Sequence, residues 1–368
     1  MEALATTLDL SRAGVQEAHV LVKPYVHRTP TVTSATLTAL ASSPQAAASL
    51  SGTEWDSRTP ACPTLRLFFK CENLQRVGAF KARGAFHALE LLRTDPEIAA
   101  NLKKRGVVTH SSGNHAQALA LAAQTHGIPA HIVMPSISIP SKIAGTKSYG
   151  ANVIFSGSTA PEREAVVKEV AARTGAILVP PYDHPAIILG QGTLALELQD
   201  QVLELTGGTP LDAIIAPCGG GGMLSGIALA CEGTGIRVFG SEPSFEGADD
   251  ARRGRVAGGR ITSVKTLTIA DGLRTPLGEY NWRIISDPQK VTAIYAVTED
   301  QIKSAMRLVL ERMKLVVEPS ACVPLAVALF NEDFRALVER EAGSAGWNLG
   351  VVFSGGNTTV ESIGELFR

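Results

Sequence analysis

The sequence predicts an α/β fold made of two open, twisted domains. Short apolar segments alternate with helical ones along most of the 368 residues. Such regular alternation indicates parallel sheets that carry helices on both faces. The length by itself suggests two domains or one large α/β unit. Glycine is abundant, at 35 residues, whereas aromatic residues make up only 5% of the chain. This balance suits α/β loops in which the backbone approaches a ligand closely.

The expected elements follow from local patterns. The spacing of Val15, Ala18 and Val22 predicts a helix within 9–27. Apolar runs predict strands at 65–70, 107–109, 130–134, 153–155, 213–216, 238–240 and 351–353. Helices are expected after Lys81, after Asn114, over 142–149, over 161–172 and after Gly222. The segment 41–63 is rich in Ala, Ser, Pro and Thr, which predicts an inserted, poorly ordered surface loop.

Charge and cysteine content restrict the function classes. The net charge is −1 and the pI is near 6.7, so binding to nucleic acid or to a membrane surface through basic charge is not expected. No apolar run approaches the ~20 residues that span a bilayer. Five scattered cysteines without a CxxC pair argue against a disulfide framework or a zinc site. With no apparent secretory signal, the sequence favours a cytoplasmic protein.

Lys81 lies in the segment Gly78-Ala79-Phe80-Lys81-Ala82-Arg83-Gly84. A lysine that forms a covalent bond with an aldehyde needs a partly dry pocket, where burial lowers its pKa. Phe80 and its small neighbours could supply such a pocket. Taken alone, however, the segment is better explained by a solvated lysine at the start of a helix, because lysine is usually exposed.

Four consecutive glycines, Gly219, Gly220, Gly221 and Gly222, precede Met223 and follow an expected strand. Several backbone N–H groups at such a turn can face one anion, and the following helix adds positive potential. The segment lacks both the GxxxxGK[ST] and the GxGxxG pattern of nucleotide sites. The alternative is a flexible turn. We interpret the run as a phosphate-binding loop.

The loop Ser111-Ser112-Gly113-Asn114-His115 also joins an expected strand to an expected helix. Its N–H and hydroxyl groups could hold a substrate carboxylate, and Asn114 could donate to a ring oxygen of a cofactor. The alternative is an ordinary helix cap, and a structural role is the alternative for His115.

Ser354 follows the apolar run 351–353 and begins Ser354-Gly355-Gly356-Asn357. A neutral hydroxyl that faces a pyridine nitrogen would leave that nitrogen unprotonated. The alternative is a turn that ends a strand. A ligand with an aldehyde, a phosphate and a ring nitrogen would use Lys81, the glycine run and Ser354 together, which predicts pyridoxal phosphate.

Acidic residues after another strand suggest a cation site. Glu242, with Ala248, Asp249 and Asp250 soon after it, could coordinate a hard divalent cation through oxygens. A solvated acidic loop is the alternative.

Together these motifs resemble the fold type II pyridoxal-phosphate enzymes, specifically the serine racemase and serine/threonine dehydratase family. The resemblance extends from Arg28-Thr29-Pro30 to Asn357 and includes the segments 190–193, 269–272 and 311–319. It implies a tryptophan synthase β-like fold with the active site between two domains. The expected large cofactor-binding domain comprises 1–100 and 185–368, and the expected small domain, which carries the substrate loop, comprises 101–184.

The resemblance also assigns roles to residues. Lys81 would form the Schiff base and act on one face of the substrate Cα, and Ser112 would serve the opposite face. Phe80, Asn114, Gly219–Gly222, Met223 and Ser354 would bind the cofactor. Ser111, Ser112, Gly113, Asn114, His115 and Arg163 would bind the substrate. The ligands of a Mg²⁺ or Ca²⁺ ion would be Glu242, the carbonyl of Ala248 and Asp250, although Phe245-Glu246-Gly247 lengthens that loop.

A homodimer is implied by the same resemblance, and ATP is a possible effector. Gln117, Tyr149 and Asn357 fit the nucleotide pattern of animal serine racemases. Ala35, Arg76 and Val77 stand where a serine, a lysine and a threonine are expected, and these departures argue against ATP activation.

The expected reaction is removal of water from a β-hydroxy amino acid, racemisation of serine at Cα, or both. Dehydration of 3-hydroxyaspartate by the same chemistry is the alternative within the family. Three further hypotheses are a β-replacement synthase, a catalytically inactive metabolite-binding protein and a Rossmann-type nucleotide-binding protein.

Overall fold

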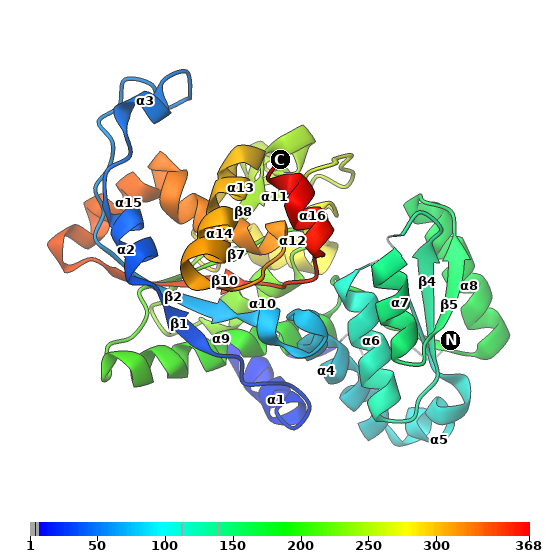
Figure 1. Ribbon diagram of the computed structural model, residues 1–368. Coiled ribbons are helices and arrows are strands. Elements are labelled where there is room, and N and C mark those ends of the chain that lie inside the picture. Colours follow the sequence, from blue (N-terminus) through cyan, green and yellow to red (C-terminus); the bar gives the residue numbers. More distant parts are fainter. Residues whose placement is uncertain (1–3, 5–6, 112, 139) are drawn as a thin grey trace.

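The computed structural model describes residue 4 and residues 7–111, 113–138 and 140–368. Its strands form two separate sheets (Figure 1). The larger sheet has six strands in the order β1-β2-β10-β7-β8-β9 and is parallel except where β1 pairs with β2. Its strands are β1 (Thr31–Thr33), β2 (Leu65–Cys71), β7 (Ala213–Pro217), β8 (Arg237–Pro243), β9 (Ala293–Val297) and β10 (Trp347–Phe353).

The smaller sheet has four parallel strands in the order β5-β4-β3-β6. Its strands are β3 (Val107–His110), β4 (Ala130–Pro135), β5 (Asn152–Ser156) and β6 (Ile177–Leu178). Helices α6 (Asn114–Thr125) and α8 (Ala160–Thr174) both pack on its strands, and α7 (Pro140–Ser148) packs on α6. All four strands fall within 101–184, while the domain boundaries themselves stay a prediction.

Two apolar clusters cover the opposite faces of the larger sheet. Strand β10 shows why: Leu349, Val351 and Phe353 belong to one cluster, and Val352 belongs to the other. Because successive side chains of a strand point to opposite faces, a fully apolar strand can be buried on both. Helices α13 (Glu299–Leu308), α14 (Pro319–Phe330) and α15 (Glu332–Ala342) contribute to the first cluster, and α1 (Arg12–Val22), α9 (Pro185–Thr206) and α10 (Gly222–Ala230) to the second.

Helix α4 (Lys81–Thr94) connects the two sheets, because it packs on α9 of the larger unit and on α6 of the smaller one. The remaining helices are α2 (Ala35–Ser42), α3 (Ala47–Leu50), α5 (Pro96–Arg105), α11 (Asp250–Ala257), α12 (Glu279–Ile285) and α16 (Val360–Leu366). Short helical turns occur at Glu72–Leu74, Arg76–Gly78, Phe245–Gly247, Val309–Met313, Asp271–Leu273 and Gly343–Ala345.

A buried ionic cluster anchors the first turn of α4. The guanidinium of Arg83 donates to both carboxylate oxygens of Glu72 and to both of Glu197. Lys70 donates to Glu197 over 2.7 Å. All four side chains are almost fully buried. A buried charge without its partner is strongly destabilising, so this cluster fixes the position of α4 relative to β2 and α9.

The segment 41–63, expected to be an inserted, poorly ordered surface loop, is largely exposed, but several of its residues contact the rest of the protein. The segment forms α3, and both Leu50 and Trp55 are buried. Glu332 of α15 accepts hydrogen bonds from the side chain of Gln45 and the amide of Ala61. These contacts with a helix that is distant in the sequence hold the segment in place.

The expected strands are all confirmed, with ends shifted by a few residues at most. Helices after Lys81, after Asn114 and near Gly222 are confirmed as well. The sequence did not predict β1, β6 and β9, which are short strands at the edges of the two sheets. All five cysteines are free. Within the described ranges, no helix is both long and apolar enough to cross a bilayer.

Candidate active site

Lys81 begins α4, and its amine lies inside the protein, where it donates to the carbonyl of Pro181 over 2.8 Å. Burial lowers the pKa of Lys81 to about 8, and the charge of Glu318 opposes that shift only in part. No carboxylate of the described residues forms an ion pair with this amine. A substantial fraction of the amine is therefore neutral near physiological pH, as a nucleophile or base requires.

Ser354 and Phe80 lie beside Lys81 because two loops pair there. The amide of Phe80 donates to the carbonyl of Ser354, and Ala79 forms a β-bridge with Gly355. The amine of Lys81 lies 5.1 Å from the centre of the Phe80 ring. Ser354 is buried at the carboxyl end of β10. Lys81 and Ser354 are far apart in the sequence, but both thus lie at the carboxyl end of β10.

The glycine run lies between β7 and α10, with Gly221 as the cap of α10. Two positions require glycine. A Cβ at Gly220 would lie 2.5 Å from the ring of Tyr182, and Gly221 has a φ of +91°, a conformation that other residues rarely adopt. Met223 is buried in the first turn of α10. The glycine run therefore has one packed backbone conformation and is not a flexible turn.

Tyr182 connects the glycine run to Lys81. Its ring faces Gly220, its carbonyl lies 2.9 Å from where a Cβ of Gly222 would be, and the preceding residue, Pro181, accepts from Lys81. The lysine and the glycine run therefore lie against the same short segment.

Asn114 lies at the start of α6 and faces a buried acid. Its amide group donates to both oxygens of Glu318, at 3.0 and 3.3 Å. The side chain of Asn357 donates to the side-chain oxygen of Asn114 over 2.8 Å, and the backbone amide of Asn357 donates to Glu318. Burial, followed by the charge of Asp271, raises the pKa of Glu318 to about 7. This network joins α6 of the smaller sheet to the Ser354–Asn357 loop of the larger one.

The structure also describes the other residues of the expected substrate loop, 111–115, except Ser112. The hydroxyl of Ser111 accepts from the amide of Gly113, which caps α6. His115 is buried, and burial together with the nearby charge of Lys81 lowers its pKa to about 3. It is therefore neutral at physiological pH. Ser112 lies outside the described residues.

Arg163 lies on α8 and donates to the carbonyl of Ser158 over 2.6 Å. Its charge adds to burial in lowering the pKa of His110, and it opposes the rise that burial causes in the pKa of Tyr182. No hydrogen bond or ion pair of the described residues joins it to Lys81 or Asn114. The structure thus places Arg163 near the site but does not bring it into the group around Lys81.

The expected cation ligands Glu242, Ala248 and Asp250 are all buried. The Glu242 carboxylate accepts from the amides of Ala251 and Arg252, and Asp250 accepts from the amide of Leu277. Burial and the charge of Asp250 raise the pKa of Glu242, and burial raises that of Asp250 to about 6. Two buried acids without a balancing cation fit an oxygen-binding divalent metal. Within the described residues, however, no group of three His, Cys, Asp or Glu side chains converges.

The arrangement fits pyridoxal phosphate on structural grounds. A Cβ at Gly220 or Gly221 would clash with Tyr182 or Leu277, so the loop takes this path only with glycine, and its backbone N–H groups can then face an anion. Ser354 offers a neutral hydroxyl and Lys81 a partly neutral amine at the carboxyl end of β10. Asn114, at the start of α6, offers an amide beside the same loop.

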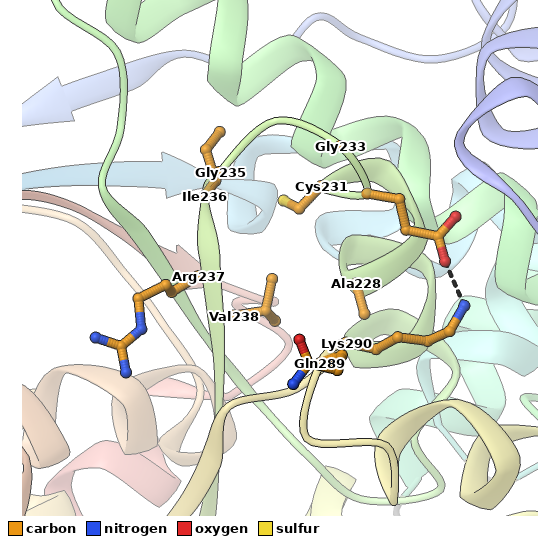
Figure 2. Close-up of a pocket in the computed structure, with 10 residues that line it drawn as sticks. Ala228, Cys231, Gly233, Gly235, Ile236, Arg237, Val238, Gln289 and Lys290 are labelled. Carbon is orange, nitrogen blue, oxygen red and sulfur yellow. Dashed lines mark hydrogen bonds and ion pairs between the residues drawn. The ribbon is translucent and has the colours of Figure 1, made fainter.

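A separate cavity of about 200 Å³ contains none of these residues (Figure 2). It lies at the end of α10 and the start of β8, where Glu232 and Lys290 form an ion pair. Because its charged side chains are already paired, with Arg237 bound to Glu341, we do not assign the chemistry to it.

Four residues around the site were not singled out from the sequence. They are Tyr182, Glu318, Asn281, whose side chain donates to the carbonyl of Gly220, and Asp183, which accepts from Asn281. Glu318 had a usable signal, because it lies in the segment 311–319 that contributes to the family resemblance. The others lie in segments without a motif. Only the tertiary contacts bring them to the glycine run.

Comparisons with known proteins agree with this geometry. The family described as pyridoxal-phosphate dependent enzyme matches residues 54–354. A serine racemase of Arabidopsis thaliana is 42% identical over 370 residues, covering 100% of this chain and 99% of that protein. The structure of maize serine racemase aligns with a TM-score of 0.82 at 38% identity, covering 97% of this chain and 96% of the maize chain.

The crystal structure of a T.th. threonine deaminase aligns with a TM-score of 0.75 at 36% identity, covering 95% of this chain and 99% of that one. The expected fold class and the expected cofactor, pyridoxal phosphate, are both confirmed by these relationships. The chain therefore belongs to the pyridoxal-phosphate dependent enzymes of fold type II, in the serine racemase and serine/threonine dehydratase family.

Proposed function

We propose that this enzyme acts on L-serine, which it racemises at Cα and also dehydrates, and that it dehydrates L-threonine in the same site. The observation that carries this proposal is the buried Lys81 amine, with its pKa near 8, beside Ser354 and the glycine run. Similarity to serine racemases and to a threonine deaminase supports the substrate class.

The chain's own residues divide into three roles in this proposal. Gly219–Gly222 and Met223 hold the cofactor phosphate, Ser354 faces the ring nitrogen, and Asn114 and Phe80 contact the ring. Ser111, Gly113, Asn114 and His115 hold the substrate carboxylate, and Arg163 lies close enough to add positive charge. When bound, pyridoxal phosphate supplies the electron sink for negative charge at Cα.

Lys81 takes the Cα proton from one face of the substrate, and Ser112 returns a proton to the opposite face. If the β-hydroxyl leaves first, the products are a 2-oxo acid and ammonia. Both outcomes begin with the same proton removal, so a difference of about 1.4 kcal/mol between the later barriers changes their ratio tenfold.

The deciding experiment incubates the cofactor-loaded enzyme with L-serine and follows D-serine and pyruvate together by chiral chromatography. We expect both products. In Ser112→Ala, D-serine formation should fall more than pyruvate formation, and equal losses would exclude Ser112 as the second proton donor. If only pyruvate forms, the enzyme is a dehydratase, and threonine and 3-hydroxyaspartate are compared as preferred substrates.

We also propose that Glu242, Asp250 and the carbonyl of Ala248 bind Mg²⁺ or Ca²⁺. The raised pKa values of the two buried acids support this. A cation should raise the melting temperature of the wild type but not of Glu242→Gln. An equal effect on both proteins would exclude this site.

A homodimer is proposed from the family relationship, and light scattering of the purified protein tests it. The same relationship offers ATP as an effector. Ala35, Arg76 and Val77 replace the expected polar residues, so we expect ATP to leave the rate of L-serine turnover unchanged.

A further inference from the structure

We propose that Asn281, on α12, is a positioning residue for the phosphate-binding loop, and that it acts by fixing the carbonyl of Gly220. This inference rests on the proposed assignment of Gly219–Gly222 to the cofactor phosphate. It adds a residue that has no direct role in the expected chemistry and no motif in the sequence.

The contact with Gly220 is short and partly buried. The Asn281 side-chain amide donates to the Gly220 carbonyl over 2.8 Å, and the amide of Gly278 donates to the same oxygen over 3.2 Å. Asn281 has no exposed surface. Its side-chain oxygen has no hydrogen-bond partner among the described residues. The same side-chain nitrogen also lies 3.4 Å from the carbonyl of Tyr182 and 3.4 Å from a carboxylate oxygen of Asp183, so the donation to Gly220 is the shortest of its three contacts.

Fixing this carbonyl also fixes the next amide. In a planar trans peptide, the C=O of one residue and the N–H of the next point in opposite directions. Because the Gly220 carbonyl points toward α12, the Gly221 N–H points away from it. Among the described residues no acceptor uses that N–H. It is therefore available to an anion, in the orientation that Asn281 sets.

The helix that carries Asn281 is itself held against the loop. Asp183 accepts from the amides of Glu279 and Tyr280, at 2.7 and 2.9 Å, and so caps α12. The preceding residue is Tyr182, which packs on Gly220, and Pro181 accepts from Lys81. The segment 181–183 thus ties the lysine amine, the glycine run and α12 to one another.

Side-chain packing also holds the loop against the segment that carries Asn281. A Cβ at Gly221 would lie 2.3 Å from a methyl group of Leu277 and 2.9 Å from the Cβ of Asn281. The loop is therefore pressed against α12, and loss of the Asn281 contact there should alter the peptide orientation rather than unfold the region.

The test compares the affinities of the full-length, cofactor-depleted protein for pyridoxal phosphate and for pyridoxal, measured by equilibrium dialysis. In Asn281→Leu, which keeps the side chain's size and adds no charge, we expect the Kd for pyridoxal phosphate to rise about tenfold. The Kd for pyridoxal, which lacks the phosphate, should change less than about twofold. A smaller loss in the same direction is expected for Asp183→Ala, a partly exposed position that also tests the proposal if Asn281→Leu does not fold.

Asn348→Leu is the matched control. Asn348 is also buried and donates to a backbone carbonyl, that of Pro210, over 2.7 Å. It lies near the opposite end of β10 from Ser354, so its loss should lower stability and leave the ratio of the two affinities unchanged.

Two other outcomes are informative. Equal weakening of both ligands in Asn281→Leu and Asp183→Ala would mean that Asn281 is only structural, which overturns the inference. The variant Gly220→Ala distinguishes a purely structural role of Asn281 from a wrong assignment of the phosphate-binding loop. If Gly220→Ala also leaves the affinity ratio unchanged, the glycine run does not bind the phosphate, and the assignment beneath the inference fails as well.

Discussion

Two buried lysines of this chain, Lys70 and Lys81, show how the same side chain is used for different purposes. Lys70 forms an ion pair with Glu197 and also donates to Thr29 and Gln201, so its charge is matched on all sides. Among the described residues, Lys81 has one neutral acceptor, the carbonyl of Pro181. Burial lowers the pKa of both amines, but only Lys70 has a direct carboxylate contact that opposes the shift. A buried charge with partners holds structure together, whereas one without them is ready to lose its proton.

The carboxylates of the two regions differ in the same way. Glu197 accepts from Arg83 and Lys70, and these charges lower its pKa despite burial. Within the described part of the chain, the Glu318 carboxylate accepts only from Asn114 and a backbone amide, and burial raises its pKa to about 7. The ionic cluster and the active site are joined by α4, in which Lys81 and Arg83 are two residues apart.

The largest expected effect on activity comes from Lys81→Ala. Loss of the amine that we propose to remove the Cα proton should reduce both D-serine and pyruvate formation by about a thousandfold. Because the amine leaves no ion-pair partner behind among the described residues, the melting temperature should change little. Assays of both products and a thermal melt check this, and turnover near the wild-type rate would refute the role of Lys81.

The converse is expected for Lys70→Met. Removing this charge leaves Glu197 buried with Arg83 alone, so stability should fall by about 3 kcal/mol. Denaturant unfolding measures this change. The protein that remains folded should keep its rate per active site, since Lys70 does not contact the residues around Lys81. A loss of rate without a loss of stability would mean that the cluster is part of the catalytic machinery.

The pH dependence of stability should have opposite signs for Glu318 and Glu197. Glu318 has a raised pKa, so the folded protein binds its proton more tightly, and the contribution of Glu318 to stability decreases as pH rises from about 4.5 to about 7. Glu197 has a lowered pKa, so its contribution is present above the unfolded pKa and is lost as pH falls.

Melting temperatures of the cofactor-free protein across this pH range test both signs. Relative to the wild type, Glu318→Gln should gain stability as pH rises from 4.5 to about 7. Glu197→Gln should instead be less stable than the wild type at neutral pH, with the difference shrinking in acid. If the melting temperatures of Glu318→Gln and Glu197→Gln, each relative to the wild type, change with pH in parallel, the predicted opposite signs are refuted.

The smallest effect is expected for Arg58→Ala, at the surface. The Arg58–Asp333 ion pair joins the 41–63 segment to α15, but both side chains are about half exposed. Exposed pairs contribute less than about 1 kcal/mol. Unfolding by denaturant should therefore show a change below that value, and a larger loss would mean that the segment depends on this pair rather than on Leu50 and Trp55.

Much of the fold could be predicted because its signals are local. Apolar runs indicated the central strands, since strands buried on both faces need apolar side chains throughout. The glycine run and Ser354 could be singled out because each follows such a run, and Lys81 because it lies beside Phe80 and small residues in the segment 78–84. Their roles in binding and catalysis stay predictions. The contacts that hold the segment 41–63 in place were not predictable, because their partners, Glu332 and Asp333, lie far away in the sequence.

By itself, the sequence determined the central strands, the family and the candidate chemistry, because strand periodicity and short motifs depend on neighbouring residues. The tertiary structure decided which charges are matched. Lys70 and Lys81 look alike in the sequence, and only the folded chain gives Glu197 to one and a backbone carbonyl to the other. It also brought Asn281 to Gly220 across 61 residues. Burial and partner geometry set pKa values and loop conformation, and both arise only when distant segments pack together.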